Sequence, residues 1–191
     1  METIVLATGN PHKVKEIREV LADQFIIKGL KEIGCTTDLP ETSPTLEGNA
    51  LQKARYVYQH YQVNCFAEDT GLEIEALGGE PGVYTARYAG PKRDPDDNMN
   101  LVLQKLLGVK ARDARFRTVV ALILDGKEYT FEGIVNGTIA LQKQGVGGFG
   151  YDPIFIPNDY EQTFAELPST EKNKISHRGR AIRKLIDFLK L

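Results

Sequence analysis

The sequence predicts an α/β fold in which a mixed β-sheet is flanked by helices. Segments with the alternating pattern of strands and segments with the apolar spacing of helices follow one another along the chain. The segments Arg115–Leu124 and Lys127–Val135 flank Asp125-Gly126, a dipeptide typical of the tight turn between two antiparallel strands. Because strands and helices intermix and at least one strand pair is antiparallel, the sheet is expected to be mixed.

The first elements follow from apolar spacing and capping residues. Residues 3–7 predict a buried strand, and the apolar positions 14, 17, 20 and 21 then describe one face of a helix. Asn10 can cap that helix, and Pro11 suits its first position, where the missing N–H costs nothing. A second helix is expected to start near Ser43-Pro44, with apolar side chains at positions 50, 54, 57 and 61.

The later elements are predicted in the same way. A short strand at 65–67 is expected to end on residues 68–71, and alternation at 72, 74 and 76 predicts a second, half-buried strand. Glycines make residues 78–82 a loop, and a third helix is expected to open at Asp94-Pro95 and close at Gly108. Two helical segments follow residues 145–150, the last of them near Arg178 to Leu191.

The size of the chain suits one domain with its own core. It has 191 residues, of which 41% are hydrophobic and 26% charged, the balance of a globular protein. Folding a chain of this mass buries about 70% of its extended surface, so neither metal nor disulfides are needed for stability. We expect residues 1–191 to form a single domain without a separate linker.

Charge and cysteine content argue against several classes of protein. The net charge of −2 gives none of the basic surplus that nucleic-acid-binding proteins carry, and the longest apolar run, at 119–124, is too short to span a bilayer. The amino terminus lacks the basic region of a signal peptide, and Cys35 and Cys65 form no CxxC pair. We therefore expect a cytoplasmic protein that binds neither nucleic acid nor membranes.

The first motif that can carry chemistry is the turn between the first strand and its helix, residues Thr8 to Lys13. A helix amino terminus presents unpaired N–H groups and a positive dipole end, which suit a phosphate chain, and Lys13 adds a cation. The Walker A pattern is absent. The alternative is an ordinary capped helix with a solvated lysine.

The second motif is acidic. Glu68 and Asp69 end a predicted strand, and Glu41 precedes the second helix. Carboxylates near phosphates are what Mg²⁺ prefers, although neighbouring strand residues point to opposite faces, so only one of Glu68 and Asp69 is expected to face a given site. The alternative is a solvated Asp-Thr-Gly turn.

The third motif, Gly145 to Pro153, contains a literal G-x-G-x-x-G. No strong strand precedes it and Pro153 interrupts the helix that should follow, so we reject a dinucleotide-binding fold. What remains is Phe149, bracketed by glycines and able to stack on a flat ring. The alternative is a glycine turn with a core phenylalanine.

The fourth motif is a basic segment, Lys172 to Lys184. It suggests an RNA-contacting helix or, more commonly, a solvated helix face. A further possibility is that His177 and Arg178 donate hydrogen bonds to a keto oxygen of a nucleobase.

Taken together, six ordered motifs resemble the inosine triphosphate pyrophosphatase family. The resemblance extends from residue 3 to about residue 185, and it implies an elongated, twisted mixed sheet with two lobes around an active-site cleft. It also implies a homodimer and Mg²⁺-dependent cleavage of purine nucleoside triphosphates such as ITP, dITP and XTP to the monophosphate and pyrophosphate. The motifs are Thr-Gly-Asn-Pro-His-Lys (8–13), Leu-Glu-Gly-Asn-Ala-Leu-Gln-Lys-Ala (46–54), Glu-Asp-Thr-Gly-Leu (68–72), the Leu-Gly-Gly-Glu-Pro-Gly segment (77–90), Gly-Gly-Phe-Gly-Tyr-Asp-Pro-Ile-Phe (147–155) and the segment ending in Ser-His-Arg (165–178).

The resemblance also implies roles for individual residues. Asp69 would accept the proton of the attacking water and bind the metal, Glu41 would be a second metal ligand, and Phe149 would stack on the purine. The substrate-binding positions are Thr8, Gly9, Asn10, Pro11, His12, Lys13, Lys53, Thr70, Phe149, Gly150, Tyr151, Asp152, Lys172, His177 and Arg178.

The chain departs from the family's pattern at one position. Many relatives have Glu-Asn-Ala before the helix that carries Lys53, whereas this chain has Gly48 at the place of the glutamate. Glu68 could supply the missing metal ligand. Two rival functions also stay open, a related pyrophosphatase that prefers another base and a nucleotide sensor without catalysis.

Overall fold

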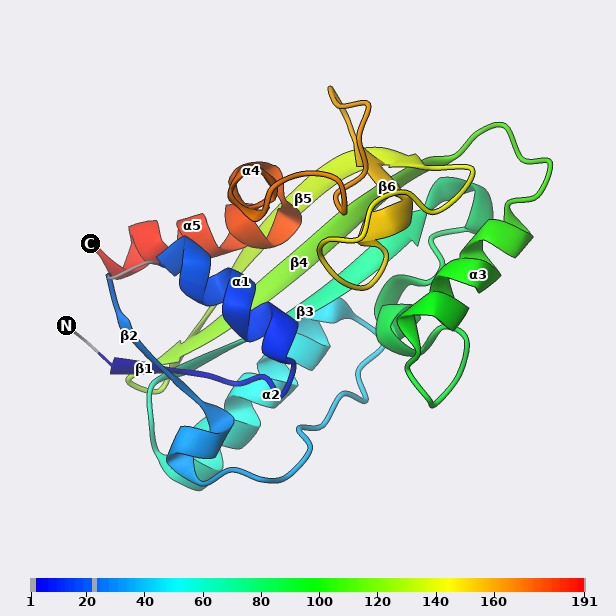
Figure 1. Ribbon diagram of the computed structural model, residues 1–191. Coiled ribbons are helices and arrows are strands. Elements are labelled where there is room, and N and C mark those ends of the chain that lie inside the picture. The colour runs from blue at the N-terminus through cyan, green and yellow to red at the C-terminus, as the bar shows by residue number, and fades with distance from the viewer. Residues whose placement is uncertain (1–2, 22–23, 191) are drawn as a thin grey trace. The chain divides into compact units, whose positions relative to one another are not determined.

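The computed structural model describes residues 3–21 and 24–190 (Figure 1). Within them, six strands form one sheet in the order β2-β1-β3-β4-β5-β6. β1 pairs in parallel with β2 and β3, whereas β5 and β6 are antiparallel, so the predicted mixed α/β sheet is confirmed. The strands are β1 (Thr3–Leu6), β2 (Ile26–Gly29), β3 (Cys65–Ile74), β4 (Asp113–Leu124), β5 (Lys127–Ile139) and β6 (Phe155–Pro157).

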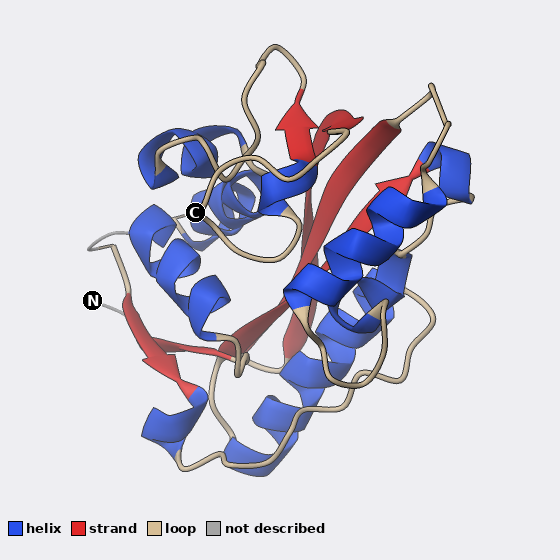
Figure 2. Ribbon diagram, turned by 45° about the vertical axis from the view of Figure 1, so that its right-hand side comes forward, coloured by secondary structure: helices blue, strands red, loops and turns tan. Residues whose placement is uncertain are grey.

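Helices connect and flank these strands (Figure 2). None of those in the described part of the chain is both long and apolar enough to cross a membrane. The α-helices are α1 (Pro11–Leu21), α2 (Leu46–Tyr61), α3 (Pro95–Lys105), α4 (Ser169–Ile175) and α5 (His177–Leu189). The short 3₁₀ turns are η1 (Leu30–Ile33), η2 (Glu75–Leu77), η3 (Gly82–Arg87) and η4 (Asp152–Ile154).

The chain divides into two compact units, each with its own core. Unit 1 comprises the described parts of Met1–Asp69, Thr118–Gly133 and His177–Leu191, and unit 2 comprises Thr70–Arg117 and Ile134–Ser176. In unit 1, α1 packs beside α5 (Figure 1), and apolar side chains of both helices cover strand residues of β1, β3 and β4. In unit 2, α3 packs against an aromatic core built on β4 and β6.

Two local predictions are confirmed by turn and cap geometry. Asp125 and Gly126 have φ angles of 49° and 78°, the left-handed pair of a two-residue hairpin turn. The Oδ1 atom of Asn10 accepts hydrogen bonds from the backbone N–H groups of His12 and Lys13, at 3.0 and 3.3 Å. The side chain therefore satisfies two of the N–H groups that the first turn of α1 leaves without a helical partner.

Other boundaries differ from the prediction. β3 is one continuous strand, where two strands with a turn at Asp69-Thr70-Gly71 were expected, because burial on both sides of a central strand outweighs local turn preference. α2 begins at Leu46 rather than Ser43, since Thr45 accepts a hydrogen bond from the N–H of Gly48 and acts as the cap. α5 begins one residue early, and the predicted end of that helix at residue 191 lies outside the described residues.

The first turn of α5 packs directly on β5 at Gly133. A Cβ atom at Gly133 would lie 2.0 Å from the carbonyl oxygen of His177 and 2.6 Å from the backbone nitrogen of Ala181. Both are backbone atoms, so neither can rotate away. A glycine at this position is what allows α5, and with it Arg178, to lie close to the sheet.

We therefore predict that Gly133→Ala destabilises the protein by about 1–3 kcal/mol or more, the cost of overpacking a filled site. Urea denaturation measures the change in the free energy of unfolding. Gly29→Ala is the matched control, because a Cβ there would make only an ordinary 3.5 Å contact. Equal stabilities of the two variants would contradict the close packing of α5 on β5.

Candidate active site

An acid–lysine cluster lies in unit 1, formed by Glu41, Lys53 and Asp69. Lys53 of α2 places its Nζ atom 2.5 Å from Oε1 of Glu41 and 3.3 Å from Oδ1 of Asp69, at the middle of β3. The residues Lys53 and Asp69 are only 5% and 8% exposed. Charges this far from water must be paired, and here one ammonium holds two carboxylates in place.

Burial and neighbouring charges alter the pKa values in this cluster. Burial raises the pKa of Asp69, and the nearby carboxylates add to that effect, although Lys53 and Lys13 oppose it. Burial alone would lower the pKa of Lys53, but the charges of Asp69, Glu41 and Glu68 outweigh it, so this pKa is raised. Asp69 is consequently a stronger base than an ordinary aspartate, and Lys53 stays a cation.

Glu68, the neighbour of Asp69 on β3, belongs to a different set of contacts. It is fully buried, and its Oε1 atom lies 2.9 Å from Nζ of Lys13 and 3.4 Å from Nη2 of Arg178. Lys13 and Arg178 come from α1 and α5, whereas Lys53 comes from α2 on the other side of the strands (Figure 2). The expectation that Glu68 and Asp69 point to opposite faces is thus confirmed.

Glu16 is a member of this set that the sequence reasoning missed. Its Oε2 atom lies 2.5 Å from Nη1 of Arg178, and the residue is buried. Glu16 follows Lys13 by three residues, a spacing that places two side chains on the same face of a helix, so that spacing was the available signal.

The turn before α1 holds several of the predicted phosphate-binding residues. Asn10 donates its backbone N–H to Oγ1 of Thr8 at 3.2 Å, so two short polar side chains stabilise the turn. Lys13 lies half-buried at the end of this turn, beside Glu68. Gly9, Pro11 and His12 are exposed at the same turn.

The donor chemistry of the acid–lysine cluster fits a magnesium ion. Mg²⁺ is commonly held by one or two carboxylates together with substrate phosphates and waters, and Glu41 and Asp69 supply two carboxylates on one ammonium. Among the described residues, no group of three or more metal-ligating side chains is found. Glu68 fits less well, because it is fully buried between Lys13 and Arg178.

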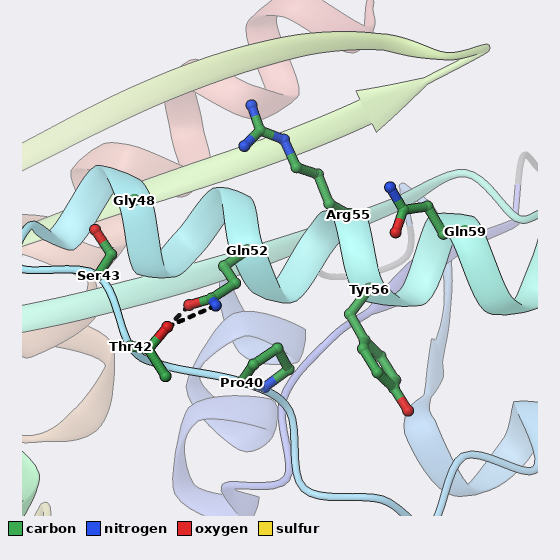
Figure 3. Close-up of a pocket in the computed structure, with 8 residues that line it drawn as sticks. All are labelled: Pro40, Thr42, Ser43, Gly48, Gln52, Arg55, Tyr56 and Gln59. Carbon is green, nitrogen blue, oxygen red and sulfur yellow. Dashed lines mark hydrogen bonds between the residues drawn. The ribbon is translucent and has the colours of Figure 1, made fainter.

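The loop that carries Glu41 explains the glycine at position 48. A Cβ atom at Gly48 would lie 1.8 Å from Oγ of Ser43. The loop therefore fills the space that a side chain at position 48 would need. The loop is tied to α2 by two hydrogen bonds between Thr42 and Gln52, both of 2.9 Å (Figure 3), and by one from the N–H of Ser43 to Asn49. These bonds hold Glu41 close to Lys53.

A pocket of about 460 Å³ lies along the same loop and α2 (Figure 3). Tyr56 and Arg55 line it farther along the helix, and none of the residues that line it is among the predicted site residues. Arg55 is engaged in a bidentate ion pair with Glu128, at 2.7 Å for each contact. The pocket therefore lies beside the acid–lysine cluster and does not contain it.

A second cluster, around Phe149, lies in unit 2. Asp152 accepts a hydrogen bond from the backbone N–H of Phe149 at 2.9 Å, and its Oδ2 atom lies 2.5 Å from Nζ of Lys172. The ammonium of Lys172 lies 5.0 Å from the centre of the Phe149 ring. The structure thus brings three of the predicted base-binding residues together. The glycine motif is followed by the 3₁₀ turn η4 and not by the α-helix that a dinucleotide-binding motif requires.

The remaining predicted residues lie as follows. Tyr151 is buried and donates a hydrogen bond to the carbonyl oxygen of Thr85 at 2.7 Å, and burial raises the pKa of its phenol. Thr70 and Gly150 are half-buried, and His177 is buried as the first residue of α5.

Because Lys172 and Arg178 are buried and paired with carboxylates, the interpretation of their segment as an exposed basic face is wrong for both residues.

Comparison with known proteins gives a consistent result. The model of the Ham1 family matches residues 4–188. A protein named dITP/XTP pyrophosphatase from Flavobacterium johnsoniae is 52% identical over 186 residues, covering 97% of each chain, and one of the same name from Bacillus subtilis is 48% identical over 193 residues, covering 99% of this chain and 98% of that one.

Solved structures agree with this result. The Staphylococcus aureus Ham1 protein has a TM-score of 0.89 at 37% identity and covers 98% of both chains. A HAM1 protein from Coxiella burnetii has a TM-score of 0.90 at 37% identity, covering 100% of this chain and 99% of that one. The resemblance drawn from the motifs is confirmed: this chain belongs to the Ham1 family.

Proposed function

We propose that this chain is a nucleoside triphosphate pyrophosphohydrolase that cleaves non-standard purine nucleoside triphosphates, ITP, dITP and XTP, to the monophosphate and pyrophosphate. Membership of the Ham1 family and the similarity to proteins named dITP/XTP pyrophosphatase support the reaction. The observation that carries the proposal is the acid–lysine cluster, in which a buried aspartate with a raised pKa lies beside a buried lysine.

In this proposal Asp69 is the general base. Its carboxylate accepts a proton from the water that attacks the α-phosphorus, and the raised pKa makes that transfer more favourable. Lys53 holds the carboxylate in position and, with Lys13, offsets negative charge on the leaving pyrophosphate. Thr8, Asn10 and the amino terminus of α1 bind the phosphate chain.

Glu41 and Asp69 would hold the Mg²⁺ ion that the resemblance implies. When bound, the ion supplies Lewis-acid stabilisation of the phosphate oxygens. The hydrogen bonds between the Glu41 loop and α2 keep this carboxylate beside Lys53, so that both acidic side chains are in place before substrate binds.

Phe149 and donor side chains would bind the base. Phe149 stacks on the purine, and Lys172, His177 and Arg178 donate hydrogen bonds, with Asp152 holding Lys172 and Glu16 holding Arg178. Hypoxanthine and xanthine carry an acceptor at position 6, where adenine carries a donor. A buried donor left unpaired costs about 1–3 kcal/mol, so ATP is disfavoured.

The cellular context is part of the same proposal. We propose a single pyrophosphatase domain that acts as a homodimer in the cytoplasm, with a purine nucleoside triphosphate as its partner. The family resemblance supports these points.

The first prediction concerns substrate choice. Purified protein should release pyrophosphate from ITP, dITP and XTP at least about 10-fold faster than from ATP at equal concentration, since one unpaired buried donor is worth about that factor. The assay is pyrophosphate release from a panel of triphosphates, with and without Mg²⁺ or a chelator. Faster cleavage of a pyrimidine nucleoside triphosphate would contradict the proposed base specificity and indicate a related pyrophosphatase. Nucleotide binding without release of pyrophosphate would indicate a nucleotide sensor without catalysis.

The second prediction concerns Asp69. Asp69→Asn keeps the shape of the side chain but cannot accept the proton, so kcat for ITP should fall by about 10²- to 10⁴-fold. Thermal denaturation should show that the variant is folded. Asp187→Asn, on the exposed face of α5, serves as a control that leaves turnover unchanged. Full activity of the Asp69 variant would remove Asp69 from its role.

A further inference from the structure

The ammonium of Lys172 lies between two aromatic rings. Its Nζ atom is 5.0 Å from the centre of the Phe149 ring and 5.5 Å from the centre of the Phe164 ring. Both distances are within the range of a cation–π interaction. The Lys172 side chain is only 4% exposed, so water competes little with either ring.

The two rings differ in how firmly they are held. Phe164 is fully buried, and its ring lies 5.2 Å from that of Phe155 and 6.2 Å from that of Phe116, in the aromatic core of unit 2. Its backbone N–H also donates to the carbonyl oxygen of Phe155 at 2.9 Å. Phe149 is half-buried, and the glycines on either side of it have positive φ angles.

This difference matters when a purine binds. The base is proposed to stack on the ring of Phe149, which the ammonium of Lys172 also faces, so Phe149 would contact both the base and the cation. The contacts of Lys172 with Phe164 and with Asp152, 2.5 Å away, do not involve the ring of Phe149. They can hold the ammonium in place while Phe149 takes up the base.

We propose that Phe164 is a positioning residue for Lys172 and, through it, a determinant of base specificity. The buried ring of Phe164 holds the ammonium of Lys172 in one position, so that the N–H donors of Lys172 have the same direction with and without substrate. The specificity part of this inference rests on the proposed function.

The test compares Phe164→Leu with Phe164→Tyr and Phe155→Leu. Leucine removes the aromatic face but keeps an apolar side chain, and tyrosine keeps the face. Phe155 is a buried member of the same core, whose ring lies 5.2 Å from that of Phe164. Phe164→Leu should lower the ratio of kcat/KM for ITP to that for ATP by about 5- to 30-fold, the range expected for a desolvated cation–π contact. Most of the loss should appear in KM for ITP.

The controls separate positioning from general damage to the core. Phe164→Tyr should keep the ratio within about 3-fold of the wild type, less than the loss of a desolvated cation–π contact. Phe155→Leu should lower the melting temperature about as much as Phe164→Leu but leave the ratio unchanged. An unchanged ratio in Phe164→Leu, or an equal change in Phe155→Leu, would overturn the proposal.

A second measurement needs no activity. Aromatic ring currents should shift the NMR signals of the ε-methylene protons of Lys172 upfield in the substrate-free protein, and Phe164→Leu should reduce that shift while Phe155→Leu leaves most of it. An upfield shift unaffected by Phe164→Leu would overturn the positioning role. A wild-type protein that cleaves no triphosphate would instead contradict the proposed function. The NMR result would still decide whether Phe164 positions Lys172.

Discussion

Two consecutive buried carboxylates on β3 are the constraint on which the rest of unit 1 depends. Because side chains alternate along a strand, Glu68 and Asp69 face opposite sides, and each must find cations there or lose its charge. Asp69 forms an ion pair with Lys53, and Glu68 forms ion pairs with Lys13 and Arg178. The helices α1, α2 and α5 therefore carry charge partners of one short strand segment in addition to their apolar faces.

This arrangement gives the two carboxylates different chemistry. Glu68 lies between two cations and is fully buried, which suits a structural anchor for Lys13 and Arg178. Asp69 shares one lysine with Glu41, an arrangement that offers two carboxylates to a metal ion. Burial together with the second carboxylate raises the pKa of Asp69, which suits a general base. Lys172 in unit 2 follows the same rule, since a buried cation is held there by a carboxylate and aromatic rings.

Most of the fold and much of the candidate site could be predicted from local signals. The cap at Asn10, the hairpin at Asp125-Gly126 and the opposite orientation of Glu68 and Asp69 follow from rules that act over a few residues. The continuity of β3 could not be predicted in this way. The residues Asp69-Thr70-Gly71 locally favour a turn, but burial in the centre of the sheet keeps them in the strand. Long-range pairs were also missed: Glu16 meets Arg178 across 162 positions of sequence, and no spacing pattern encodes that contact.

The most direct test of the central claim is a crystal structure with Mg²⁺ and a non-hydrolysable analogue of ITP. The account predicts a metal ion bound by carboxylate oxygens of Glu41 and Asp69 at about 2.1 Å. Glu68 should still be paired with Lys13 and Arg178. A metal ion on Glu68, or one that contacts neither Glu41 nor Asp69, would contradict the assignment of the acid–lysine cluster as the catalytic centre.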